Sequence, residues 1–336
     1  MRVILRAAAI AFLALVICLT ATWASAGLWY RLPFPEPARV FGAVVFAILA
    51  VSAIAALFTR WRTRTTLVYT LAFALVCFWW STIEPPSKAD WAPDVARQVT
   101  GALDGNLLTL TNVRDFAWRS ETDFTERWET RSYDLEKLQG LDLFMSYWAG
   151  PEMAHMILSF GFANGEQIAW SVEVRRRAGG EFSPLADLFK SNPLVIVAAD
   201  ERDVVGVRSN VRGEDVQIYR LRASSEAARR LLLEYVADAN ALSRKPQFYN
   251  SLTTNCTTTV VKMMRSVGDV VPLDWRLFVN GYLPNYAYDR KAVDTGHSME
   301  ELRALAQIDA RAKADGLSPN YSNAIRVGVP QPKQHF

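Results

Sequence analysis

The chain has 336 residues, of which 51% are apolar and 21% are charged, and its formal net charge is +3 at pH 7. This length suffices for a membrane segment and one domain of ordinary size with a core of its own. Because the two signs of charge nearly balance and no basic run is interleaved with aromatic residues, the composition argues against a nucleic-acid partner.

Three apolar runs predict three transmembrane helices. They cover residues 7–26, 40–59 and 66–83, and each has about the 20 residues that a helix needs to cross the hydrocarbon core. Arginines precede the first run and fill the loop before the third, namely Arg2, Arg6, Arg60, Arg62 and Arg64. The positive-inside rule puts these arginines in the cytoplasm. Residues 1–84 are thus predicted to be a three-helix membrane anchor, with the later domain on the non-cytoplasmic side.

Aromatic residues support the same orientation. Those near the predicted outer ends of the spans are Trp23, Trp29, Tyr30, Trp79 and Trp80, as in an aromatic belt. An alternative for the first run is a cleavable signal peptide, because Ala24-Ser25-Ala26 resembles a cleavage site. Cleavage there would leave the second and third runs as a hairpin, so the later domain would stay outside.

The exported domain is predicted to cover residues 91–330. Glu84-Pro85-Pro86 breaks the third helix, and a short linker reaches Trp91, which keeps the domain near the lipid surface. The residues after Pro330 are typical of a disordered tail.

The domain mixes strand and helix patterns, which predicts an α+β fold. Residues 107–110 and 194–197 are predicted strands, and residues 204–207 are expected to pair with 216–221 in a hairpin. Residues 225–242 have a helical period.

One hairpin can be predicted in detail. Apolar and polar side chains alternate along residues 155–162 and again along 167–175, and Ala163-Asn164-Gly165 between them is a turn signal. A three-residue loop with Gly165 in the left-handed region would place Phe162 opposite Glu166.

That register has a chemical consequence. It pairs His155 with Glu173 and Ile157 with Ser171, and it gathers the large apolar side chains on one face. The other face collects His155, Ser159, Ser171 and Glu173, so a carboxylate can orient an imidazole. Glu173 is therefore the predicted orienter, with Ser171 as the next candidate.

Cys256 is the cysteine of the exported domain, since Cys18 and Cys77 lie in predicted spans. Thr253-Thr254-Asn255 supplies capping residues before a predicted helix at 257–265 that ends at Gly268. At a helix start, the macrodipole favours the thiolate, and the backbone N–H groups could stabilise an oxyanion. The alternative without catalysis is a capped helix whose first residue is simply a small one.

A thiol nucleophile needs a base, and histidine is the usual one. His335 lies in the predicted tail, and His297 precedes a capping box of Ser298 and Glu301 that opens a helix to about Ala312. His155 on the polar hairpin face is therefore the candidate base. The spacing of histidine and cysteine matches no metal motif, and no cofactor is expected.

Several stretches together resemble the Lnb N-terminal periplasmic domain family. They are LFMSYWAGPEMAHMILSFGF from Leu143, SVEVR from Ser171, ADERD from Ala199 and YNSLTTNCTTTVVKMM from Tyr249. The resemblance covers about residues 110–270. It implies a circularly permuted papain-like fold, related to NlpC/P60 enzymes, in which a strand histidine and a helix-start cysteine form a catalytic pair. It also implies a lipoprotein N-acyltransferase, although here the spans precede the domain.

Three functions remain open from the sequence. The first is a thiol acyltransferase that moves an acyl chain from a membrane phospholipid to a lipoprotein amine, with Cys256, His155 and Glu173 as the catalytic residues. The second is a cysteine peptidase or amidase that acts on cell-wall peptides. The third is a non-catalytic anchored module. The aromatic residues expected to line the substrate site in either enzyme are Phe278, Tyr282, Tyr286 and Tyr288. Arg175-Arg176-Arg177 is interpreted as a solvated strand end rather than a phosphate site.

Overall fold

The computed structural model describes residues 1–266, 268 and 270–332. The chain forms two compact units. The first contains residues 1–85 and 183–191, and the second contains residues 86–182 and the described residues from 192 onward. The tail predicted after Pro330 ends in residues 333–336, which include His335 and lie outside the described residues.

Three long helices make up most of the first unit. They are α1 (Arg2–Arg31), α2 (Glu36–Ala56) and α3 (Arg62–Ser81). Among the described residues, only Val3–Arg31 and Glu36–Ala56 are long and apolar enough to cross a membrane. The prediction of a third span is therefore wrong. Helix α3 begins with two arginines and ends with two tryptophans and a serine, which lowers its hydropathy.

The first unit is held together by helix packing and by one later segment. Tyr69 on α3 donates its hydroxyl to the Ile17 carbonyl of α1 at 3.2 Å. The later segment carries the short helix α4 (Pro184–Asp187). In it, the Phe189 ring stacks on Tyr30 with 5.3 Å between centroids, and Lys190 Nζ donates to the Trp80 carbonyl at 2.8 Å.

The second unit is built on a sheet of eight strands. Seven follow one another in the order β1-β2-β9-β8-β7-β6-β10, and β5 pairs with β2. Only β2 and β9 pair in parallel. The strands are β1 (Thr100–Asp104), β2 (Leu107–Arg114), β5 (Trp128–Asp134), β6 (Leu138–Tyr147), β7 (Ala154–Phe162), β8 (Gln167–Val174), β9 (Leu194–Ala199) and β10 (Asp215–Arg220). A separate pair is β3 (Ala117–Trp118) with β4 (Phe124–Thr125).

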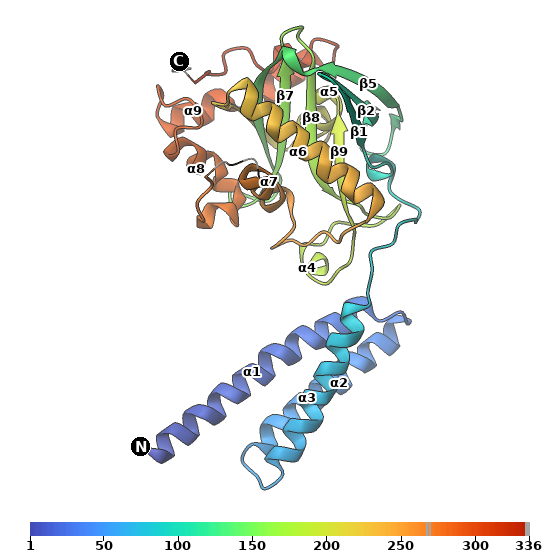
Figure 1. The fold of residues 1–336 in the computed structure, drawn as a ribbon, viewed down its shortest axis with the longest axis vertical. Coiled ribbons are helices and arrows are strands. Elements are labelled where there is room, and N and C mark those ends of the chain that lie inside the picture. The colour runs from blue at the N-terminus through green and yellow to red at the C-terminus, as the bar shows by residue number, and fades with distance from the viewer. Residues whose placement is uncertain (267, 269, 333–336) are drawn as a thin grey trace. The chain divides into compact units, whose positions relative to one another are not determined.

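Helices cover both faces of this sheet. Helices α6 (Ser225–Arg244) and α7 (Cys256–Ser266) pack on one face, and Figure 1 shows α6 running across the strands. The other face is covered by α5 (Glu201–Val204), α10 (Asp309–Asp315) and α11 (Tyr321–Ala324). Helices α8 (Leu283–Asp289) and α9 (Met299–Ala306) complete the unit. The mixture of strands and helices confirms the predicted α+β class.

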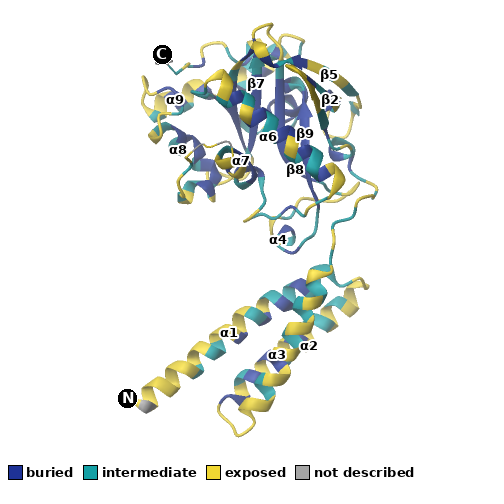
Figure 2. Cartoon of the chain, in the orientation of Figure 1, coloured by how far each residue is buried: buried dark blue, intermediate teal, exposed yellow. Residues whose placement is uncertain are grey.

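The amphipathic helix α6 explains how the larger core forms. Its apolar residues, spaced three and four apart, are buried while its charged residues are exposed, as Figure 2 shows along its length. Trp170 and Tyr235 meet between sheet and helix with 5.3 Å between ring centroids. The predicted helices at 225–242 and 257–265 and the strands at 107–110 and 194–197 are confirmed.

Two predicted elements are wrong. Residues 204–207 form no strand, because Asp200 caps α5 and the chain continues into the π-helical turn η3 (Val207–Arg212). Strand β10 pairs with β6 instead. The helix predicted from Ser298 to about Ala312 is interrupted at Gln307, which bridges to Gln217 of β10, although its capping box is present.

Candidate active site

Cys256 is the first residue of α7, and Asn255 caps the helix. The Asn255 Oδ1 accepts from the N–H groups of Thr257 at 3.0 Å and Thr258 at 2.9 Å. The predicted polar cap is therefore confirmed. Since these two N–H groups already have an acceptor, they are not free to stabilise an oxyanion, contrary to our expectation. Cys256 is buried, with 6% of its surface exposed.

The hairpin of β7 and β8 has the predicted register. Ile157 pairs with Ser171, and the Phe162 N–H donates to the Glu166 carbonyl at 2.9 Å. Gly165 has a φ of +85°, in the left-handed region that its turn requires. The alternation of side chains along the two strands therefore places the polar residues together, as the sequence predicted.

On that face the imidazole of His155 meets two oxygen atoms. Its Nε2 lies 2.6 Å from Ser171 Oγ and 3.0 Å from Glu173 Oε1. The Ser171 hydroxyl donates to the same carboxylate oxygen at 2.7 Å. The Nε2–H group therefore points at the serine and the carboxylate, which leaves Nδ1 as the nitrogen for the thiol of Cys256.

The three groups shift one another's acidity. Burial alone would raise the pKa of the Cys256 thiol, but the hydrogen bond and charge of His155 outweigh it and lower that pKa. Burial alone would lower the pKa of His155, yet the Glu173 carboxylate raises it to about 9. The pKa of Glu173 is well below its usual value despite burial, because His155 and Arg208 stabilise the carboxylate. Thiolate and imidazolium are thus favoured together.

Asn280 ties the two halves of this site together. Its Nδ2 donates to the Ala154 carbonyl at 2.7 Å and to Thr257 Oγ1 at 3.0 Å, and lies 3.8 Å from Cys256 Sγ. Its Oδ1 accepts from the Ala154 N–H at 3.0 Å. One amide thus links the start of β7 to the start of α7. This role is not predictable from the sequence, since Asn280-Gly281 is typical of an ordinary turn.

Arg208 lies on the opposite side of Glu173. It belongs to η3, is buried, and its guanidinium contacts Glu173 Oε1 at 3.2 Å and Glu214 Oε2 at 3.3 Å. Glu214 in turn accepts a hydrogen bond from Ser146 of β6. A chain of alternating charges therefore extends from the imidazole through Glu173 and Arg208 to Glu214. Arg208 could not be predicted as a site residue, because residues 204–207 have the pattern of a strand where the structure has the start of η3.

The other residues considered from the sequence lie elsewhere. Arg175 and Arg176 bind groups of their own unit, namely the Ala96 carbonyl and Asp94. His297 pairs with Asp294 at 2.8 Å, away from the thiol. Among the aromatic residues, Phe278 lines a groove beside α7, Tyr282 lines a pocket beside Gly281, and Tyr288 donates to the His297 carbonyl. Within the described residues, no group of three or more metal-binding side chains occurs.

Comparison with known proteins identifies a family for this region. Residues 124–281 match the model of the Lnb N-terminal periplasmic domain family, which confirms the resemblance noted in the sequence. Curated proteins and solved structures gave no match. The matched region contains His155, Glu173, Cys256 and Asn280. Together with the two apolar helices, it indicates a membrane-anchored protein with a periplasmic domain.

Proposed function

We propose that this protein is a periplasmic thiol acyltransferase of the bacterial inner membrane, with Cys256 as nucleophile, His155 as acid and base, and Glu173 as orienter. The observation that supports it best is the order of groups from sulfur to imidazole to carboxylate, with the Nε2 to Oε1 distance of 3.0 Å. A histidine held in this way can both stabilise a thiolate and transfer a proton.

The first half-reaction would form a thioester. The Cys256 thiolate attacks an ester carbonyl carbon of a phospholipid, and the bond to the glycerol oxygen breaks as the tetrahedral intermediate collapses. The imidazolium of His155 gives its proton to the departing alkoxide, so a lysophospholipid alcohol leaves. Glu173 keeps the imidazole oriented through Nε2, as carboxylates do in related triads.

The second half-reaction would pass the acyl group on. A lipoprotein amine attacks the thioester carbonyl while neutral His155 takes one of its protons. The carbon–sulfur bond then breaks, which releases an amide and restores the thiolate beside imidazolium. In this proposal the fold is a circularly permuted papain-like one, as the resemblance implies, and the pairing of a helix-start cysteine with a strand histidine supports it.

A cysteine peptidase or amidase is the second candidate, and one pocket favours it. A cavity of about 420 Å³ lies next to Gly281, beside Asn280, and is lined by tyrosine, tryptophan and several polar side chains. Its polar residues are Asp215, Gln217 and Arg303. An open cleft that combines aromatic with polar side chains suits a peptide, and acyl-enzyme chemistry serves hydrolysis as well as transfer.

Intact-mass analysis separates the two candidates. The full chain is incubated with phospholipid or with peptidoglycan fragments, and the mass of the protein is measured before turnover completes. A fatty-acyl adduct on Cys256 is expected from phospholipid. An adduct from peptidoglycan fragments alone would favour the peptidase, and no adduct with either would count against both.

We also propose that the N-terminus is cytoplasmic, as the arginines require. Because two crossing helices return the chain to its starting side, a cytoplasmic N-terminus and a periplasmic domain together require an odd number of crossings. A reporter active only in the periplasm should work after Trp91 and fail between Arg60 and Arg64. A cytoplasmic reporter at the same places is the control, and the reverse pattern would contradict the proposed orientation.

A further inference from the structure

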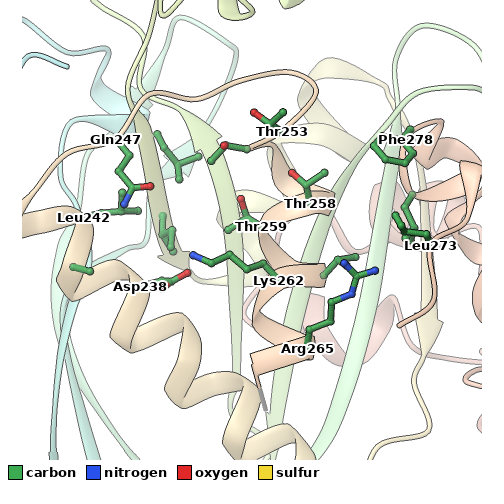
Figure 3. Close-up of a pocket in the computed structure, with 16 residues that line it drawn as sticks. Asp238, Leu242, Gln247, Thr253, Thr258, Thr259, Lys262, Arg265, Leu273 and Phe278 are labelled. Atoms are coloured by element: carbon green, nitrogen blue, oxygen red, sulfur yellow. The ribbon is translucent and has the colours of Figure 1, made fainter. Parts of the chain in front are cut away.

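A groove of about 460 Å³ runs along α7 between that helix, α6 and the loop before Phe278. Figure 3 shows its side chains, with Thr253 and Thr258 near the start of α7 and Arg265 near its end. Half of its lining residues are apolar, among them Leu194, Ile196, Leu242, Val261, Leu273 and Leu277, and the other half are polar or charged. A groove of this size with an apolar wall beside polar groups is typical of a site that binds a small amphiphile.

The groove is separate from the thiol. Residues two apart on a helix are about 200° apart around its axis, so Thr258 points away from the direction of Cys256. Lys262 and Arg265 follow Thr258 by four and seven positions and share its side of α7. Cys256 is absent from the lining. The side of α7 that carries Thr258, Lys262 and Arg265 therefore faces a groove to whose lining Cys256 does not contribute.

The groove has an apolar outer rim. Leu273 is 77% exposed and Phe278 is 56% exposed, although both are large apolar side chains. Trp275, between them in the sequence, is also exposed, and so is Leu252, which directly precedes the lining residue Thr253. Exposed apolar side chains around a groove indicate a surface that binds a membrane or another apolar partner.

The groove also contains an unused hydrogen-bond donor. Thr259 is buried, with 7% of its surface exposed, and its Oγ1 has no partner within the described residues. Figure 3 shows Lys262 extended across the groove toward Asp238, so the charges at the inner end face each other. The hydroxyl is thus a buried donor available to a ligand, and an ester carbonyl is a suitable acceptor.

The membrane that the N-terminal helices can cross is an apolar partner within reach of this domain. The linker between Ser81 and Trp91 spans at most about 35 Å even when fully extended, and the helices that it follows include two able to cross a membrane. Leucine, phenylalanine and tryptophan are the residues with which peripheral segments enter the lipid interface. We propose that this groove and its rim contact the membrane and hold the acyl chain of one bilayer phospholipid, independently of turnover at Cys256.

Photo-crosslinking in proteoliposomes tests this proposal. The full chain carrying Cys256→Ser is reconstituted with a phospholipid that bears a diazirine in its acyl chain, and crosslinked peptides are mapped by mass spectrometry. We expect crosslinks at residues 252–278 in addition to those on α1 and α2, which serve as the internal reference. Since the thiol is absent, this result does not depend on the proposed chemistry.

Matched variants sharpen the test. Leu273→Ser with Phe278→Ser should lower the crosslink yield in the domain about tenfold or more relative to α1, because two apolar groups leave the interface. Leu103→Ser with Leu107→Ser, on the exposed β1–β2 edge, is the control and should change nothing. Crosslinks confined to the N-terminal helices, or crosslinks between two copies of the chain through this groove, would overturn the proposal.

Discussion

The two sides of the His155 imidazole are built by different physical means. On the sulfur side, neutral groups hold the geometry, since Asn280 hydrogen-bonds to Ala154 and Thr257 around Cys256. On the carboxylate side, charges dominate, with Glu173 placed between the imidazole and the buried Arg208. The first side therefore sets the position of the sulfur, and the second sets the charge state of the histidine.

The largest effect is expected from the nucleophile itself. Cys256→Ser should reduce acyl transfer by about 10⁴-fold or more, since a hydroxyl is not ionised by this histidine and covalent catalysis is lost. Intact mass should then show no acyl adduct. Cys18→Ser and Cys77→Ser, which change thiols of the helical unit, are the controls. Activity retained in the Cys256 variant would mean that neither side of the imidazole serves catalysis.

Replacing the imidazole should remove the link between the two sides. His155→Ala should lower activity by about 10³-fold. The rate of Cys256 alkylation against pH should shift to higher pH, because the group that lowers the thiol pKa is gone while burial still raises it. His297→Ala is the matched control. An unchanged alkylation profile would separate His155 from the thiol.

Glu173→Gln tests the charged side alone. Glutamine keeps the shape and a hydrogen-bond acceptor but not the charge, so activity should fall by about 10-fold to 100-fold. The carboxylate raises the pKa of His155 to about 9, so its loss lowers that pKa. The upper limb of the pH profile for transfer should then move to lower pH, and alkylation of Cys256 to higher pH. Equal loss with no movement of either profile would assign Glu173 a structural role only.

How far the sequence predicts the site depends on the range of the interactions. Alternation and a glycine turn are local signals, and they specify the hairpin register that brings His155 to Glu173. Capping is also local, so the position of Cys256 at a helix start follows from Asn255 before it. The predictions of the register and of the cap thus succeeded because neighbours in sequence determine both.

Other predictions failed because distant partners determine the structure. Residues 204–207 look like a strand because their valines are apolar, but the preceding Asp203 is fixed by Arg114 and by the indole of Trp118, each more than 80 residues away in sequence. These buried bonds hold α5 and η3 in place, and with them Arg208. The third span failed for a different reason, since arginines that orient a helix also shorten its apolar stretch. Asn280 gave no signal, because its partners lie on two other elements.

Asn280 gives the last and smallest expected effect, and it tests the neutral side. Asn280→Ala removes hydrogen bonds to Ala154 and Thr257, so the melting temperature should fall, by an amount corresponding to about 1–3 kcal/mol, and activity should fall about tenfold. The alkylation profile should hardly move, because an uncharged group is lost.

Asn280→Asp would place a carboxylate near the sulfur, because Asn280 Nδ2 lies 3.8 Å from Cys256 Sγ. That charge disfavours the thiolate, so the profile should move to higher pH. The pair of variants therefore separates position from charge at one residue. Were both variants to shift the profile equally, the sulfur side would also act through charge, and the contrast between the two sides of the imidazole would not hold.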